Sequence, residues 1–177
     1  MLLGGLAEEY RTLYEGSINS AKEHNFFRPL NPGNLDILMS GTIRAIDERL
    51  DLEPQGQHLV CFAGGMVGIG AKIFQRDEVG IARKLVEGCI WAYESTPSGI
   101  MPETFHAVAC KEDDCQWEEA RWHQEILVRQ NDRQGNADSH IRDKRLPPGF
   151  TDIADRRYIL RCFLTCIVTH IIVLTGR

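Results

Sequence analysis

The residues that could do chemistry gather in the segment from Gln57 to Glu103. This segment opens with His58 and an apolar run, continues through a glycine-rich turn and two helical patterns, and ends on Glu103. An imidazole and a carboxylate are the usual groups for acid–base work, which makes these two residues the first candidates for a site. From residue type and position alone, Glu103 is expected to be an exposed loop acid and His58 a structural histidine.

The glycines of the same segment raise the alternative of a phosphate-binding loop. Gly65 and Gly70 have the spacing of such a loop, but Ala71-Lys72-Ile73 follows them where Lys and then Ser or Thr would be needed. The surrounding positions are apolar nearly all round, which predicts a buried helix whose glycines allow close neighbours. We therefore expect packing, and no nucleotide site.

The six cysteines permit disulfides without proving them. Cys110 and Cys115 lie close enough in sequence to pair with each other. With His106 nearby they could instead hold zinc, although the spacing is not that of a zinc ribbon.

Four segments, in this order, carry a resemblance to a known family. They are His58-Leu-Val-Cys-Phe-Ala-Gly-Gly-Met66, Gly88-Cys-Ile-Trp-Ala-Tyr93, Thr96-Pro-Ser-Gly-Ile-Met-Pro-Glu103 and Arg145-Leu-Pro-Pro-Gly-Phe150. The chain resembles the class I α-1,2-mannosidases of glycoside hydrolase family 47, most closely the fungal type, from Leu2 to Arg161. The resemblance implies that residues 1–177 are a single incomplete fragment of the catalytic domain, and that residues 158–177 diverge from the family.

The resemblance also implies which residues contact the substrate. Glu103 matches a sugar-binding glutamate, His58 an active-site histidine and Arg161 the arginine that precedes the catalytic base. Cys61 and Cys89 match the disulfide of the family.

The catalytic groups themselves are expected to be missing. Inverting glycoside hydrolysis needs an acid and a carboxylate base about 6.5–9.5 Å apart. In the resemblance the position of the base is occupied by Phe163, and that of a second sugar-binding glutamate by Cys166. The acid and the threonine that ligates Ca²⁺ would lie outside the chain, so no catalytic residue and no metal ligand are expected here. A coding-sequence artefact and real divergence both explain residues 162–174.

The resemblance implies an all-α fold, part of an (α/α)7 barrel with roughly three of its seven helical hairpins. Apolar positions at three- and four-residue spacing predict amphipathic helices from Leu6 to Ala21 and from Val79 to Tyr93. A further helix is expected over residues 117–128, followed by a polar linker over 129–145. Residues 35–45 have the pattern of a short strand or of a loose helical turn.

Length, composition and charge limit which classes of protein this chain can belong to. A chain of 177 residues with 43% hydrophobic and 25% charged residues is the size of one ordinary domain. A net charge of −5 argues against nucleic-acid binding. The start of the chain lacks the pattern of a signal peptide. The final apolar run is interrupted by Arg161 and His170, and it falls short of the roughly 20 residues of a membrane-spanning helix.

The function implied by the resemblance is trimming of α-1,2-linked mannose from high-mannose N-glycans. The location it implies is the lumen of the endoplasmic reticulum or Golgi, or secretion, because full-length members are membrane-anchored or secreted. This chain alone is expected to be inactive. The alternative is a non-catalytic mannose-binding or quality-control relative of the same fold; the four quoted segments disfavour an unrelated helical interaction module.

Overall fold

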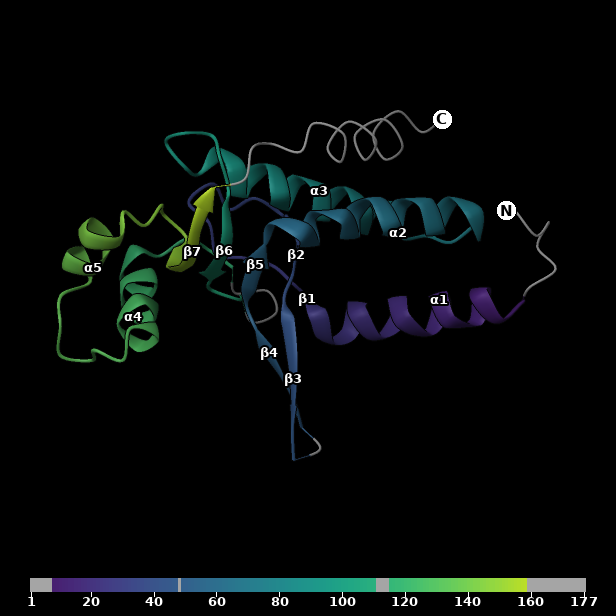
Figure 1. The fold of residues 1–177 in the computed structure, drawn as a ribbon, viewed down its shortest axis with the longest axis horizontal. Helices are drawn as coiled ribbons and strands as arrows, with labels where there is room; N and C mark the ends of the chain where they lie inside the picture. The colour runs from purple at the N-terminus through teal and green to yellow at the C-terminus, as the bar shows by residue number, and fades with distance from the viewer. Residues whose placement is uncertain (1–7, 48, 111–114, 159–177) are drawn as a thin grey trace.

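The structure, a computed structural model, describes residues 8–47, 49–110 and 115–158 (Figure 1). Five α-helices lie in this part of the chain: α1 (Glu8–Ser20), α2 (Phe62–Ile73), α3 (Val79–Glu94), α4 (Glu119–Arg129) and α5 (Ala137–Lys144). Two further turns are helical, the π-helical η1 (Ala21–Asn25) and the 3₁₀ turn η2 (His58–Cys61). None of the described helices is long and apolar enough to cross a membrane.

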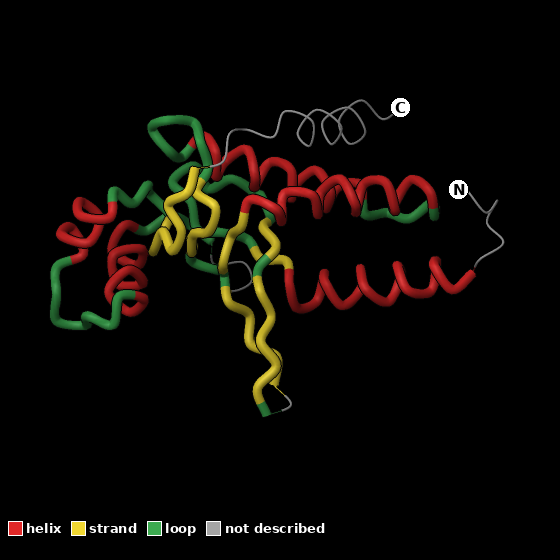
Figure 2. The backbone as a smooth tube through the Cα atoms, viewed as in Figure 1, coloured by secondary structure: helices red, strands yellow, loops and turns green. Residues whose placement is uncertain are grey.

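Three small antiparallel sheets accompany the helices, so the predicted all-α fold is wrong for the described residues (Figure 2). One pairs β1 (Phe26–Phe27) with β2 (Met39–Ser40), and a hairpin pairs β3 (Thr42–Ile46) with β4 (Arg49–Glu53). The third has the order β5–β6–β7, with bounds Gln55–Gln57, Pro102–Ala107 and Phe150–Tyr158. Of the two alternatives expected over residues 35–45, the structure has the strand, in β2 and β3. The other strands were not predicted, because β1 and β5 are only two and three residues long and β6 pairs with strands distant in sequence.

Helices α2 and α3 form the hairpin that the central segment predicts. At Gly64 a Cβ atom would lie 2.8 Å from the Val86 side chain and 3.2 Å from the Ala82 carbonyl oxygen, so the glycine allows the two helices to approach closely. The prediction that α2 is buried all round is wrong for one face. Along that face and the preceding turn, five apolar side chains are 40% to 64% exposed: Leu59, Phe62, Met66, Ile69 and Ile73.

Helix α1 packs on α2 through the later part of its apolar stripe. Ile18 is buried, and the Tyr14 ring lies 5.1 Å from that of Phe74. Tyr10 and Leu13, on the earlier part of the same stripe, are exposed. The predicted amphipathic helix is therefore present, but only half of its apolar stripe is covered.

The main core lies where α3 and α4 meet the three-stranded sheet. Phe105 of β6 stacks on Phe150 of β7 at 4.1 Å between ring centroids, and Trp91 of α3 packs edge-on against Phe150. Gly56 of β5 faces Phe105, where a side chain would collide with the ring. This packing fixes β6, the strand that carries Glu103.

The predicted polar linker over residues 129–145 contains helix α5. Asn136 caps it, accepting a hydrogen bond from the backbone nitrogen of Asp138 at 2.8 Å. Arg145 ends it in the left-handed conformation, at φ 45°. The helix is short and polar, so it has no apolar period that could reveal it in the sequence.

Candidate functional site

The structure places His58 and Glu103 at the same end of the three-stranded sheet. His58 opens η2 directly after β5, and Glu103 is the second residue of β6. Strands β5 and β6 pair Gln57 with Thr104, so the next position along the antiparallel ladder sets His58 beside Glu103. Two residues that are far apart in sequence become neighbours because of this register.

Both side chains keep buried polar atoms without a partner. His58 is 7% exposed, and its Nδ1 atom makes no hydrogen bond within the described part of the chain. The same holds for the Oε2 atom of Glu103. Burying an unsatisfied polar atom costs about 1–3 kcal/mol, so such atoms are rare unless they serve a purpose. Two such unpaired polar atoms on neighbouring residues can form hydrogen bonds with the hydroxyl groups of a ligand.

The position of His58 is fixed by packing and by a covalent bond. Its ring lies edge-on to Tyr93 of α3, with 6.2 Å between centroids. Three residues later a disulfide joins Cys61 to Cys89 of α3, with 5.8 Å between the Cα atoms and a sequence separation of 28. The disulfide implied by the resemblance is thus present, and it ties the histidine-bearing turn to α3.

Strand β7 brings the chain to the same place. Its last residue, Tyr158, pairs with Pro102, next to Glu103. Arg161, Phe163 and Cys166, the other residues that the resemblance concerns, lie outside the described residues. Their predicted roles therefore stay predictions.

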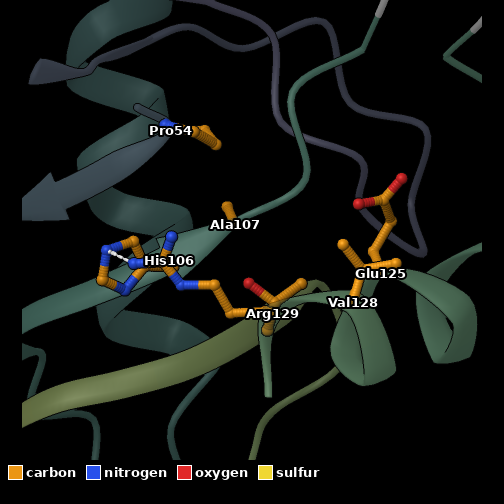
Figure 3. A pocket seen from close by; sticks show the side chains of 7 residues that line it. Pro54, His106, Ala107, Glu125, Val128 and Arg129 are labelled. Carbon is orange, nitrogen blue, oxygen red and sulfur yellow. Dashed lines mark hydrogen bonds between the residues drawn. The ribbon is translucent and has the colours of Figure 1, made fainter. Parts of the chain in front are cut away.

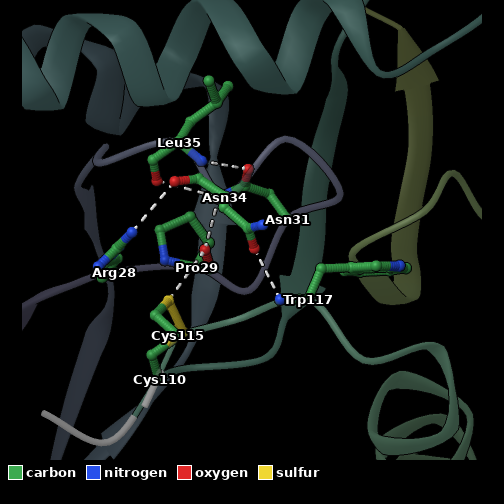
Figure 4. Close-up of a disulfide and its surroundings, with 8 residues drawn as sticks. All are labelled: Arg28, Pro29, Asn31, Asn34, Leu35, Cys110, Cys115 and Trp117. Atoms are coloured by element: carbon green, nitrogen blue, oxygen red, sulfur yellow. Dashed lines mark hydrogen bonds between the residues drawn. A yellow bond between two sulfur atoms is a disulfide. The ribbon is translucent and has the colours of Figure 1, made fainter. Parts of the chain in front are cut away.

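A second disulfide, between Cys110 and Cys115, anchors the loop after β6 (Figure 4). Cys110 donates a backbone hydrogen bond to Arg28 at 2.9 Å, and the Cys115 sulfur touches the Pro29 carbonyl oxygen at 3.8 Å. Because both sulfurs are used in the disulfide, they cannot serve as thiolate ligands, which removes the zinc alternative at this place. The described residues hold no group of three or more His, Cys, Asp or Glu that could bind a metal ion. The expectation about the threonine that ligates Ca²⁺ in the family stays a prediction.

Sequence reasoning missed an electrostatic cluster further along β6. Glu53 Oε1 lies 2.8 Å from the Arg129 guanidinium and 3.1 Å from Nε2 of His106, while Oε2 lies 2.5 Å from Arg44. The hydrogen bond from Arg129 is the main cause that lowers the pKa of Glu53. No sequence pattern indicates this cluster, because the β5–β6 register that sets Gln55 opposite His106 is seen only in the structure.

His106 is the buried member of the cluster, at 3% exposure. Burial lowers the pKa of His106, and the charge of Arg129 lowers it further, so the imidazole is neutral at pH 7. Its Nε2 atom is in hydrogen-bond contact with the Arg129 guanidinium, which can only donate (Figure 3). Its Nδ1 atom is buried and has no partner among the described residues.

Comparison with known proteins gives one family. The family model described as glycosyl hydrolase family 47 matches residues 1–162. A probable mannosyl-oligosaccharide alpha-1,2-mannosidase 1B of Aspergillus fumigatus is 31% identical over 97 residues, covering 54% of this chain and 18% of the relative. A mannosyl-oligosaccharide alpha-1,2-mannosidase 1B of Emericella nidulans is 37% identical over 92 residues, or 51% of this chain and 16% of the relative.

The matched part of the chain thus spans less than a fifth of the length of these curated relatives. No solved structure matches the chain significantly.

Proposed function

Because the chain belongs to glycosyl hydrolase family 47, we propose that it is part of an α-1,2-mannosidase-like glycoside hydrolase and supplies one wall of its sugar site. The observation that carries the proposal is the neighbouring pair of His58 and Glu103, whose buried polar atoms have no partner in the described residues. The substrate class is the terminal α-1,2-linked mannose of high-mannose N-glycans, in keeping with the names of the relatives.

In this site the two residues bind and orient the sugar. The carboxylate of Glu103 accepts hydrogen bonds from sugar hydroxyls, and charge-assisted bonds of this kind are stronger than neutral ones. The ring of His58 offers one donor and one acceptor. The Cys61–Cys89 disulfide keeps His58 in position before the ligand arrives, which reduces the entropy lost on binding.

We further propose that these 177 residues bind sugar without turnover. The resemblance puts Phe163 where the family has its base, and a phenyl ring cannot take a proton from water. A lone carboxylate such as Glu103 cannot perform both halves of a two-carboxylate reaction. The binding is independent of calcium, because His58 and Glu103 need no metal to meet a hydroxyl.

The second candidate is a non-catalytic mannose-binding or quality-control relative, which Phe163 favours. Reading the transcript across the codon for Arg161 separates the two candidates. An Arg-Pro-Glu-x-x-Glu-Ser sequence there would indicate the enzyme, and the printed sequence would indicate the non-catalytic relative.

Two disulfides in one small chain support a location in the lumen of the secretory pathway or outside the cell, where thiols are oxidised. The formal charge of −5 gives no support for a nucleic-acid partner.

The proposal is tested by titrating the ¹⁵N-labelled chain with α-1,2-mannobiose and following its amide resonances. We expect saturable shifts around His58 and Glu103, and affinity about tenfold or more weaker in Glu103→Gln, because a hydrogen bond to a charged group is lost. Glu118→Gln, a change at an exposed carboxylate, is the matched control. Equal affinity in Glu103→Gln and in the control would refute the proposed site.

A further inference from the structure

A small cavity opens beside the His106 cluster. It has a volume of about 200 Å³ and lies between the end of β4, strand β6 and helix α4 (Figure 3). Its walls combine apolar and polar side chains, namely Pro54, Ala107, Val128, His106, Glu125, Arg129 and, from β7, Thr151. His106 lies three residues beyond Glu103, or about 10 Å along the strand, so the cavity is separate from the site proposed above.

Arg129 meets the cavity with unused donors. Its Nη2 atom bonds Glu53 and His106, and the guanidinium has no other hydrogen bond to the described residues. Its Nε and Nη1 groups are therefore available to a ligand. Figure 3 shows the Arg129 side chain reaching from α4 to the His106 ring.

Glu125 brings an unused acceptor to the same cavity. It stands four positions before Arg129 on α4, the spacing at which a glutamate and an arginine commonly pair. Here Arg129 instead contacts Glu53 and His106. Glu125 has no ion pair or hydrogen bond with any described residue. A carboxylate and a guanidinium thus line one cavity without neutralising each other.

The third polar group is His106. Its side chain is 4% exposed, and its Nδ1 atom is buried without a partner in the described part of the chain. His106 thus contributes to the cavity chiefly through Nε2, which is in hydrogen-bond contact with the Arg129 guanidinium and helps to hold it in place.

We propose that this cavity binds one hexopyranose residue, the neutral polyhydroxylated ring of a sugar. Each hydroxyl both donates and accepts, so a single ring can serve Glu125 and Arg129 at once. The apolar side chains of Pro54, Ala107 and Val128 can lie against the C–H groups of the ring. The Glu125 carboxylate would repel an anion, and the Arg129 guanidinium would repel a cation. The cavity therefore favours a neutral ligand.

The cavity deepens the proposed function by adding a second sugar position on the same strand as Glu103. This inference depends on the proposed function only in one respect, namely that the sugar is mannose. One branched oligosaccharide could occupy both positions, and its affinity would then exceed that of a single mannose.

The test is a titration of the full chain, labelled with ¹⁵N, with methyl α-D-mannopyranoside. We expect saturable shifts in the amides from Glu125 to Arg129, with affinity at this site weakened about tenfold or more in Glu125→Ala. Glu125 has no native partner, so its substitution should leave the fold intact. The control Glu118→Ala, and Glu103→Gln, should leave the shifts on α4 unchanged.

Absence of shifts on α4, or an unchanged affinity there in Glu125→Ala, would overturn the inference. Inorganic phosphate that binds this cavity more tightly than the sugar would also overturn it, because a neutral ligand is proposed. The titration distinguishes the failure of one proposal from the failure of the other. Amide resonances near Glu103 that do not shift contradict the proposed function, and amide resonances on α4 that do not shift contradict this inference.

Discussion

Glu53 shows at the residue scale how charge is organised around β6. Its carboxylate bonds Arg129 and Arg44, and contacts His106, at the end of the β3–β4 hairpin. Its pKa is lowered in the folded chain, chiefly by the bond from Arg129. A carboxyl group whose folded pKa is depressed adds stability above its unfolded pKa, and that stability is lost as the pH falls through the folded value.

We therefore expect Glu53→Gln to lower the free energy of unfolding at pH 7 by about 1–3 kcal/mol, since Arg129 and Arg44 lose a charged partner. The difference between the two proteins should shrink below about pH 4.5, the ordinary value for a glutamate, as Glu53 takes up a proton. Urea unfolding at pH 7 and pH 3 measures this difference. A gap that stays constant between the two pH values would show that charge is not its cause.

The candidate site was predicted in part at this scale. His58 and Glu103 were named from the resemblance, and the register of β5 and β6 makes them neighbours. The cluster of Glu53, His106 and Arg129 could not be predicted, because it depends on how α4 docks on the sheet and on irregular pairing between β6 and β7. Neither feature leaves a periodic signal in the sequence.

Among the helices and strands, the periodicity of apolar residues predicted those helices that bury one face. Helices α1 and α3 were predicted near their observed positions because their apolar residues recur at helical spacing, and the helix expected over residues 117–128 is observed as α4. Most strands were not predicted for a physical reason: they are two to nine residues long and draw their stability from contacts between residues distant in sequence, such as Phe105 and Phe150. Helix α5 was missed because its side chains are mostly polar.

The two disulfides should differ in what they contribute to stability. Cys61 and Cys89 close a loop of 28 residues, and Cys110 and Cys115 one of 5. On the chain-entropy account, replacing the first pair by alanine should cost about 3–4 kcal/mol and the second only about 2 kcal/mol. Denaturant unfolding of the two double-alanine variants without reductant measures both values. A larger loss from the second pair would contradict this order.

The whole molecule exposes an apolar stripe along η2 and α2. Leu59, Phe62, Met66, Ile69 and Ile73 recur at spacings of three and four residues, so they form one continuous row. Exposed apolar rows of this kind promote association. They are also what a fragment of a larger helical barrel would show, and the chain matches less than a fifth of the length of its curated relatives.

We expect the purified chain to associate as its concentration rises, and Met66→Glu to reduce this association without loss of stability. Leu50→Glu, at a similarly exposed apolar residue on the β3–β4 hairpin, is the control and should associate like the parent chain. Sedimentation velocity over a hundredfold range of concentration measures both. A chain that stays monomeric and melts sharply would count against the fragment interpretation.

We propose above that this chain binds terminal mannose and does not cleave it. One sample tests both halves: the purified chain is incubated with α-1,2-mannobiose and calcium, and ¹H NMR follows ligand binding and free mannose over time. We expect line broadening of the disaccharide, which Glu103→Gln should reduce, and no release of mannose beyond a heat-killed control. Release of mannose by this chain would show that its catalytic groups lie elsewhere and would contradict the proposal.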